Sequence, residues 1–336
     1  MKKAKLLYFF ASLLTLQSCS KALMDEDAEN TNVQNFDLLW ENIDKRYSFF
    51  EFKNIDWDEL RREYRPQAQA AQNDRELFEV MDNLLFKLRD GHVNLISPFN
   101  TSRNWNWRLN SPPNYNSNIV ERTYLGNDHY ITGPFRNQRI GNILYVNYSS
   151  FSSGFSNNQL NFLFGQNQTA KAVIIDVRDN GGGSLSNVTR IVNYFAAEKT
   201  PAGYNIFKSG PGHDDFTSPV QQYAQPGEDN TPFTKPVVVL TNRGCYSATT
   251  DFVRKMRVLP QVTIMGDTTG GGGGLPFSGE LPNGWTYRFS TTQSFDQNGN
   301  NIEHGIAPDT LVYLKPEDEA QNKDTMIEAA IELLNQ

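Results

Sequence analysis

The stretch KAVIIDVRDNGGG, residues 171–183, combines an unbroken apolar run with a polar end and three consecutive glycines. An apolar run without alternation is typical of a strand that is buried on both faces of a sheet. A second such run, PVVVLTN at residues 236–242, lies downstream, and helical patterns follow the two runs at residues 185–195 and 247–256. Because buried strands alternate with helices, the sequence predicts an α/β fold for this part of the chain.

Ahead of these runs, the apolar residues follow helical spacing. One helical face comprises Phe36, Leu39, Trp40, Ile43 and Tyr47, and a second comprises Leu77, Phe78, Met81, Leu84, Leu85 and Leu88. The helical pattern ends where Asp90 and Gly91 break it in LRDGHVNL. We therefore expect a small N-terminal helical domain at residues 33–95, followed by a core domain at residues 96–336.

The first residues have the layout of an export signal. A basic start and an apolar stretch from Leu6 to Leu16 precede small residues and Cys19, and the stretch is too short to span a membrane. Because the cut would fall before the cysteine of LQSC, residues 1–18 resemble a bacterial lipoprotein signal, although an ordinary signal peptide with a chance cysteine is the alternative. The resemblance implies lipidation of Cys19 and anchoring in a lipid bilayer.

The segment after Cys19 is polar, acidic and free of aromatic residues. This composition is typical of a flexible tether, which we expect at residues 19–32. The predicted product is an exported, membrane-anchored bacterial lipoprotein that faces the periplasm or the cell surface.

Composition narrows the class of partner. The chain has 336 residues, 38% of them hydrophobic, which suits a globular core. Its formal net charge of -7 repels phosphate backbones, so we do not expect nucleic acid as a partner. If Cys19 is lipidated, Cys245 has no partner for an intramolecular disulfide. We expect no metal and no cofactor, and the sequence specifies no oligomeric state.

Ser247 stands between the second buried strand and the helix after it, in TNRGCYSATTDF. A serine here can be a helix cap, which is the commoner role. It can also be a nucleophile, because its hydroxyl and the first amides of the helix face the same volume. Cys245 lies two residues earlier, where a small buried thiol is the simpler interpretation.

The glycines Gly181, Gly182 and Gly183 end the first buried strand. Without side chains, their backbone amides can approach a substrate carbonyl, although a purely structural turn is equally consistent with the local sequence. A phosphate-binding loop is excluded, because no Lys-Ser/Thr pair closes the stretch.

Five motifs, in this order and spacing, resemble the carboxy-terminal processing and tricorn-core family of serine peptidases. They are LRDGHVNL (88–95), VIIDVRDNGGG (173–183), VVLTNRGCYSA (238–248), IMGDTTGGGGG (264–274) and IEHGIAPD (302–309). Residues 36–60 also resemble the helical segment of tricorn-like members. The resemblance implies a crotonase-like (ClpP-like) core, a spiral of ββα units, and a serine peptidase that hydrolyses peptide bonds of polypeptide substrates.

The family has two catalytic arrangements. One branch pairs the serine with a lysine in the glycine-rich segment, where this chain has Gly272. The tricorn-like branch uses a histidine ahead of the core and a later glutamate, and His92 and Glu303 match those positions. The resemblance thus implies Ser247 as nucleophile, His92 as general base and Glu303 as the group that orients it; His304, beside Glu303, is the competing base.

The resemblance also implies an oxyanion hole formed by the amides of Gly182 and Ala248. Further substrate contacts are expected from the neighbouring glycines Gly181, Gly183, Gly270 and Gly271. The interval between His92 and the strand that begins near residue 143 is short for a PDZ module, so we expect none.

Two other functions compete with proteolysis. A catalytically weak or inactive relative could bind a hydrophobic ligand or a peptide, with Leu275 and Phe277 lining the pocket. An esterase could use the same serine on acyl groups. The presence of Ser247, His92 and Glu303 together favours a hydrolase.

Overall fold

The computed structural model describes residues 30–102, 105, 111–165, 167–228 and 231–336. The predicted signal peptide, Cys19 and most of the tether lie outside the described residues. None of the helices in the described ranges is long and apolar enough to cross a membrane.

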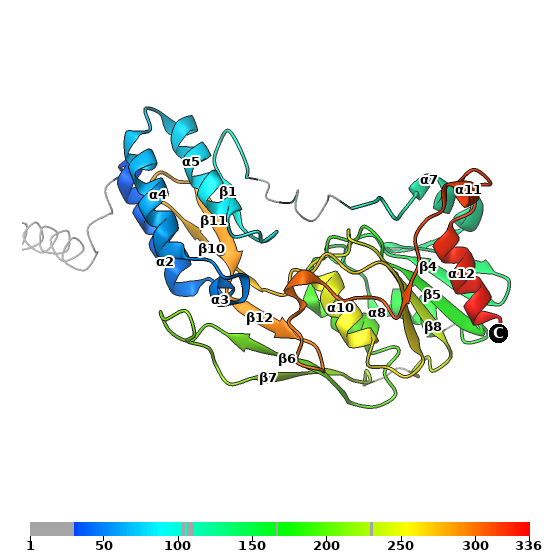
Figure 1. Cartoon of the computed structure of the whole chain (residues 1–336). Helices are drawn as coiled ribbons and strands as arrows, with labels where there is room; N and C mark the ends of the chain where they lie inside the picture. Colours follow the sequence, from blue (N-terminus) through cyan, green and yellow to red (C-terminus); the bar gives the residue numbers. More distant parts are fainter. Residues whose placement is uncertain (1–29, 103–104, 106–110, 166, 229–230) are drawn as a thin grey trace, which may run out of the picture.

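A seven-stranded sheet forms the centre of the larger part, in the order β13-β9-β8-β5-β4-β3-β2 (Figure 1). Its strands are β2 (Tyr130–Thr132), β3 (Phe135–Ile140), β4 (Ile143–Asn147), β5 (Ala172–Asp176), β8 (Val237–Thr241), β9 (Val262–Gly266) and β13 (Thr310–Leu311). From β4 to β13 the strands pair in parallel, and β3 and β2 continue the sheet by antiparallel pairing. Every residue of β5 and β8 is buried, so the α/β fold predicted from the two apolar runs is confirmed.

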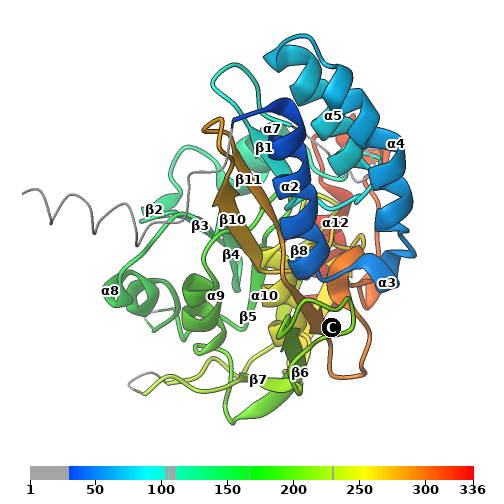
Figure 2. The same ribbon diagram turned by 90° about the vertical axis from the view of Figure 1, so that its left-hand side faces the viewer.

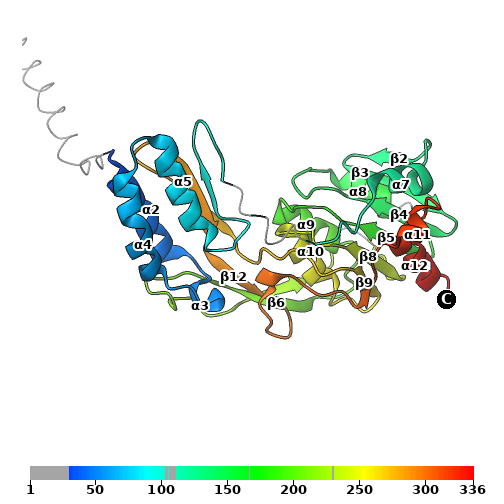
Figure 3. The ribbon, with the colours of Figure 1, turned by 45° about the horizontal axis from the view of Figure 1, so that its top comes forward.

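Helices cover this sheet on both faces. Along β5, Val173 and Ile175 pack into the cluster that contains residues of α9 (Leu185–Val192) and α10 (Ala248–Met256). Ile174 points the other way, into the cluster that contains α12 (Thr325–Leu334), α7 (Ser117–Ile119) and the π-helix η1 (Val120–Leu125). Figure 2 shows α9 and α10 next to each other, and in Figure 3 they lie on the other side of β5 and β8 from α12. Alternate side chains of one strand therefore hold the two helical layers.

Shorter elements complete this part. They are α8 (Asn157–Leu160), the π-helix η2 (Asn161–Gly165), the 3-10 helix η3 (Ile302–His304) and α11 (Pro316–Glu319). The described residues between β1 and β4 form α7, η1, β2 and β3, which is not the architecture of a PDZ module.

The N-terminal helices are α2 (Asn32–Arg46), α3 (Phe50–Lys53), α4 (Trp57–Ala70) and α5 (Asp74–Phe86), and they lie at the opposite end of the molecule from β2 and α12 (Figures 1 and 3). They pack on a small sheet in which β1 (Asn94–Ile96) pairs with β11 (Thr286–Ser290), and β11 pairs with β10 (Pro276–Glu280). Trp285, Tyr287 and Phe289 share one apolar core with these helices.

The single domain boundary expected at residue 95 is therefore corrected, because residues 276–290 fold with the N-terminal helices. The pairing of Leu95 with Tyr287 joins distant parts of the chain, and local periodicity carries no signal of such a contact.

A third sheet contains β12 (Thr292–Phe295), β6 (Thr200–Phe207) and β7 (Val220–Ala224). Of these strands, β6 and β7 pair antiparallel and form a hairpin. Figures 1 and 3 show β12 and β6 between the N-terminal helices and α10. The turn of this hairpin also reaches the N-terminal helices, because His213 Nε2 lies 2.9 Å from Asp44 Oδ1.

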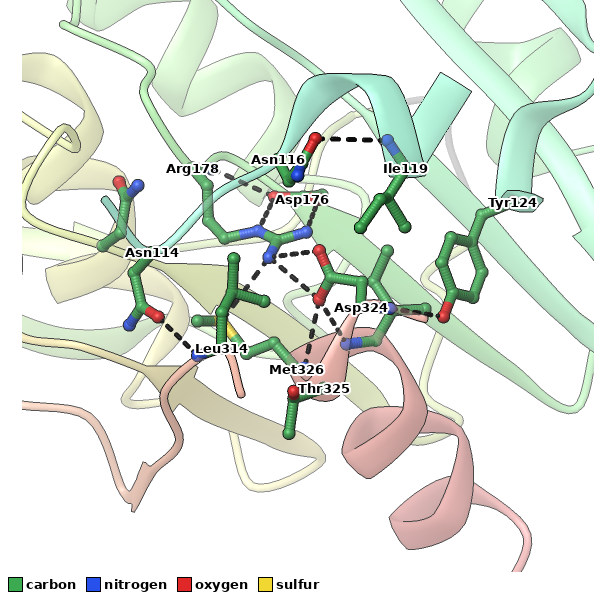
Figure 4. Close-up of polar contacts among 12 residues, drawn as sticks. Asn114, Asn116, Ile119, Tyr124, Asp176, Arg178, Leu314, Asp324, Thr325 and Met326 are labelled. Carbon is green, nitrogen blue, oxygen red and sulfur yellow. Dashed lines mark hydrogen bonds and ion pairs between the residues drawn. The ribbon is translucent and has the colours of Figure 1, made fainter. Parts of the chain in front are cut away.

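A buried ion network docks the C-terminal helix beside the end of β5 (Figure 4). Arg178 donates to both oxygens of Asp176, at 2.9 and 2.6 Å, and to Asp324 at 2.9 Å. Asp324 in turn caps α12 by accepting from the amide of Met326 at 3.0 Å. Because Arg178 pairs with both carboxylates, none of the three charged side chains is buried without a partner at the strand end that leads into the glycine loop.

Candidate active site

Ser247 lies at the turn from β8 into α10, with a backbone φ of 57° and ψ of -118°. Positive φ is disfavoured for a residue with a Cβ and is concentrated at functional sites. Its amide donates to Gly271 O at 2.8 Å, which helps hold the turn. Among the described residues, the Ser247 side chain makes no capping hydrogen bond to α10, and it remains partly exposed. The geometry therefore favours the nucleophile over the helix cap.

The His92 side chain contacts Ser247. Its Nε2 lies 2.9 Å from Ser247 Oγ, within hydrogen-bond distance, and the residue is only 3% exposed. Its ring packs against Tyr246, with the ring centroids 5.0 Å apart. The structure thus joins a residue just before β1 to the turn after β8, as the motif order implied.

Asp90 is the carboxylate beside the imidazole. It is fully buried, its Oδ1 accepts from the His92 amide at 2.8 Å, and the same oxygen lies 3.8 Å from His92 Nδ1. Burial alone raises the pKa of Asp90, but the positive charge of Lys53 and the contacts with His92 outweigh it and leave the pKa lowered. Asp90 is therefore held as an anion at neutral pH.

Glu303 has other partners. Its Oε1 accepts from Lys53 Nζ at 2.8 Å and its Oε2 from the Gly273 amide at 2.9 Å. Burial, followed by the negative charge of Asp90, raises the pKa of Glu303 to about 7 despite Lys53. Glu303 thus contacts Lys53 and the second glycine loop, and Asp90 lies 3.8 Å from the imidazole; the orienting role of Glu303 that the resemblance implied stays a prediction.

His304 does not replace His92. It is exposed, and its ring lies against Phe52 with centroids 5.0 Å apart. Partial desolvation of the ring and the nearby charge of Lys53 lower its pKa. The contact with Ser247 therefore favours His92 as the base.

The first glycine loop packs against the serine turn. Gly182 has a φ of 103°, and a Cβ at this position would lie 3.0 Å from Ala248 N and 2.6 Å from the Tyr246 carbonyl oxygen. A side chain is therefore excluded, and the loop backbone can approach the serine. The Ala248 amide has no acceptor among the described residues, which leaves it available to a substrate oxygen. The Gly182 amide, by contrast, donates to Asn180 Oδ1 at 3.0 Å.

Of the four glycines expected to contact substrate, two are exposed and two are buried. Gly181 and Gly183 are exposed on the first loop. Gly270 and Gly271 are buried, where Gly270 donates to Cys245 O at 2.6 Å and Gly271 accepts from Ser247. The prediction for the second pair is corrected, since these glycines support the serine turn from behind.

Gly272, where the other branch of the family has lysine, has no room for a side chain. Its φ is 81°, and a Cβ would lie 2.5 Å from Tyr246 Cζ. The Tyr246 ring that packs on His92 therefore occupies the space that a catalytic lysine would need.

The remaining candidates have structural contacts. The Cys245 thiol is fully buried, donates to Val177 O at 3.0 Å, and burial raises its pKa to about 12. Phe277 packs against the N-terminal core beside Phe289 instead of lining a ligand pocket near the glycine loops. Within the described ranges, no group of three or more histidine, cysteine or acidic side chains could hold a metal ion.

Sequence reasoning missed two residues of this site. Asp90 lies within the DGH motif, where an acid two residues before the base is a usable signal. Lys53 carries no local signal, because its importance depends on its contact with Glu303, 250 residues away.

Two family models match two different parts of the chain. A sequence model described as peptidase family S41 matches residues 142–312, and one described as the tricorn protease C1 domain matches residues 28–86. No curated protein sequence matches the chain.

Solved structures extend the match to most of the chain. The crystal structure of a Parabacteroides merdae ATCC 43184 protein assigned to the peptidases is 47% identical, with a TM-score of 0.86 over 91% of this chain and 97% of that one. The photosystem II D1 C-terminal processing protease (13% identity, TM-score 0.54, 89% of this chain and 100% of that one) shares the fold. So does the tricorn protease (15% identity, TM-score 0.59, 90% of this chain and 36% of that one).

These structures confirm the crotonase-like core with an N-terminal helical region, and the tricorn C1 match agrees with the tricorn-like branch. With its ordered motifs, its partly exposed serine and the match over its core, the chain belongs to peptidase family S41 and is a serine-type peptidase.

Proposed function

We propose that this peptidase hydrolyses peptide bonds of exported or partly unfolded polypeptides, with Ser247 as the nucleophile and His92 as the general base. The observation that carries the proposal is the distance of 2.9 Å between Ser247 Oγ and His92 Nε2. A serine hydroxyl is a weak nucleophile unless a neighbouring base accepts its proton, and this contact supplies such a base.

The reaction then follows from the positions of these groups. Ser247 Oγ bonds to the substrate carbonyl carbon while its proton passes to His92 Nε2, and the carbonyl electron pair moves onto oxygen. Collapse of this intermediate breaks the C–N bond, and the leaving amine takes the proton from His92. A water molecule, deprotonated by His92, then attacks the acyl-serine and releases the carboxylic acid and the serine hydroxyl.

The charges that develop in this reaction have partners in the site. The imidazolium forms 3.8 Å from the Asp90 carboxylate, so we assign the stabilising charge to Asp90 in place of the Ser-His-Glu arrangement. The Ala248 amide faces the oxyanion from the start of α10. We propose that the glycine loop supplies the second donor from Gly182, whose amide would be shared with Asn180.

The exposed backbone of Gly181 and Gly183 supports an extended peptide as the substrate. Main-chain pairing binds many sequences with little side-chain selection, which suits a peptidase that acts on partly unfolded chains.

A fluorophosphonate, which modifies activated serines, tests the nucleophile. We expect the wild-type protein to be labelled at Ser247, Ser247→Ala to be unlabelled, and Ser218→Ala, which alters an exposed serine, to be labelled at the wild-type rate. Parallel assays with a peptide and an ester of the same acyl group separate the peptidase from an esterase. Absence of label on Ser247 in the folded wild-type protein would contradict the proposal and favour a binding protein.

We propose further that the protein is exported and anchored in a bilayer through Cys19, on the strength of the signal pattern at residues 1–18. Mass spectrometry of Cys19 in the membrane fraction tests this directly. Cys19→Ser should move the protein out of the membrane fraction, and unchanged membrane association of this variant would refute the anchor.

A further inference from the structure

Lys53, at the end of α3, is a buried cation between the N-terminal helices and the active site. Its side chain is 6% exposed, and its Nζ contacts Glu303 Oε1 at 2.8 Å. The same nitrogen lies within hydrogen-bond distance of the Tyr47 hydroxyl at 3.1 Å and of two carbonyl oxygens. A buried ammonium is costly unless it is paired and hydrogen bonded, so this arrangement ties several segments to one atom.

The two carbonyl contacts reach the segment that carries the base. Lys53 Nζ lies 3.2 Å from Leu88 O and 3.1 Å from Arg89 O, directly before Asp90 and His92. Arg89 has a φ of 44°, a conformation that is strained for a residue with a side chain and persists only where surrounding contacts hold it. Lys53 therefore stabilises the turn that directs His92 toward Ser247.

The carboxylate contact reaches the segment that carries the nucleophile. Glu303, held by Lys53, accepts from the Gly273 amide at 2.9 Å, and its carbonyl accepts from the Gly272 amide at 3.1 Å. The neighbouring Gly271 accepts from the Ser247 amide at 2.8 Å. A continuous set of hydrogen bonds thus runs from Lys53 through Glu303 and the second glycine loop to Ser247.

Charge balance makes the same lysine necessary. Asp90 and Glu303 are both fully buried and interact electrostatically, and Lys53 is the cation that acts on both. Tyr47 interacts with both carboxylates and with Tyr246, His92 interacts with Asp90, and Arg243 interacts with His304 beside Glu303. Without Lys53, two buried carboxylates would face each other with less compensation, and the pKa of Glu303, already raised to about 7, would rise further, so that Glu303 would stay protonated at neutral pH.

We infer that Lys53 is a positioning residue through which docking of the N-terminal helices assembles the Ser247–His92 pair, by holding the turn before His92 and, through Glu303, the loop behind Ser247. This inference rests on the proposed function. It makes the N-terminal region part of the catalytic apparatus, although none of its helices contributes a group that touches the reacting atoms.

The experiment compares full-length wild type, Lys53→Met, Lys53→Arg and Lys87→Met, where Lys87 is exposed and close in sequence to the turn. Each variant is checked for folding by circular dichroism, then for kcat, KM, fluorophosphonate labelling rate and the pH profile of kcat/KM. We expect Lys53→Met to lower kcat and the labelling rate by roughly 10²-fold, with KM changed by less than about threefold, because small displacements of a catalytic pair have effects of this size. Lys53→Arg should recover part of the labelling rate, and Lys87→Met should match wild type.

The pH profile of kcat/KM distinguishes a positioning role from a purely structural one, because a structural role would leave its ionisations unchanged. In Lys53→Met, the ionisation of Glu303, which wild type shows near pH 7, should move to higher pH, because the cation that lowers this pKa is gone. Adding Glu303→Gln to Lys53→Met should remove that ionisation. If Lys53→Met does not fold, this double variant is compared with Glu303→Gln alone, and slower labelling of the double variant supports the inference.

Labelling of folded Lys53→Met at the wild-type rate would overturn the inference and leave the proposed function intact. Equal labelling of the double variant and Glu303→Gln would do the same. Failure of wild type to label at Ser247 would instead overturn the proposed function and, with it, the role of Lys53.

Discussion

Replacing Asp90 with asparagine tests which carboxylate supports the base. The substitution preserves size and keeps an oxygen that can accept from the His92 amide, so it removes the charge with little change of shape. At the observed 3.8 Å between Asp90 Oδ1 and His92 Nδ1, and an effective dielectric constant of ~20, the attraction between carboxylate and imidazolium is about 4 kcal/mol.

Because the imidazolium forms in the transition state, loss of this attraction translates into a slower reaction. A barrier increase of about 4 kcal/mol corresponds to roughly 10³-fold, and the dipole of the asparagine amide should recover part of it. We therefore expect Asp90→Asn to lower kcat/KM by roughly 10²-fold to 10³-fold. The acid limb of the pH profile should move to lower pH, since the protonated imidazole is less stabilised.

The assay is peptide hydrolysis across pH 5 to 9, with folding checked by thermal unfolding. Glu303→Gln is the comparison, and Asp214→Asn, an exposed aspartate, is the control. Glu303→Gln should lower kcat/KM by less than about tenfold, because it keeps an acceptor for Gly273 and resembles the protonated form of a carboxyl whose pKa is raised to about 7. Near-wild-type activity of Asp90→Asn together with an inactive Glu303→Gln would refute the reasoning and restore Glu303 as the partner of His92.

Three further predictions follow from single positions. Ser247→Gly and Ser247→Ala should both lack hydrolysis. Ser247→Gly should have the higher Tm, because a φ of 57° costs a residue with a Cβ about 1 kcal/mol or more. Equal Tm values for the two variants would contradict this. The pKa of Glu303, raised to about 7 by burial first and by Asp90 second, exceeds its value of ~4.3 in the unfolded chain. Protonation of Glu303 therefore stabilises the fold fully below about pH 4, and this contribution, on the order of 3 kcal/mol, is lost as the pH rises through 7. Between pH 5 and pH 8, the free energy of unfolding in urea should fall less for Glu303→Gln than for wild type. Equal falls for the two proteins would refute this prediction. Gly272→Ala should lower the free energy of unfolding by about 2 kcal/mol and should also lower kcat/KM, because the added Cβ would lie 2.5 Å from Tyr246 Cζ. A Tm equal to that of wild type would argue against that contact.

Local sequence accounts for much of the fold. The apolar runs at residues 171–183 and 236–242 predict strands buried on both faces, and every residue of β5 and β8 is buried. The N-terminal helical faces are equally visible, since period and burial agree along α2 and α5. These predictions succeed because the pattern of apolar residues reports directly on which face of an element is covered.

By itself, the sequence determined the fold class, the family and the elements that carry Ser247 and His92, because these depend on periodicity and on ordered motifs. Only the tertiary structure decided that residues 276–290 fold with the N-terminal helices, that Asp90 lies beside the imidazole, and that Lys53 binds Glu303. The physical reason is that pairing of strands and of buried charges depends on distances between residues far apart in the chain, here 250 residues for Lys53 and Glu303, which no local pattern encodes.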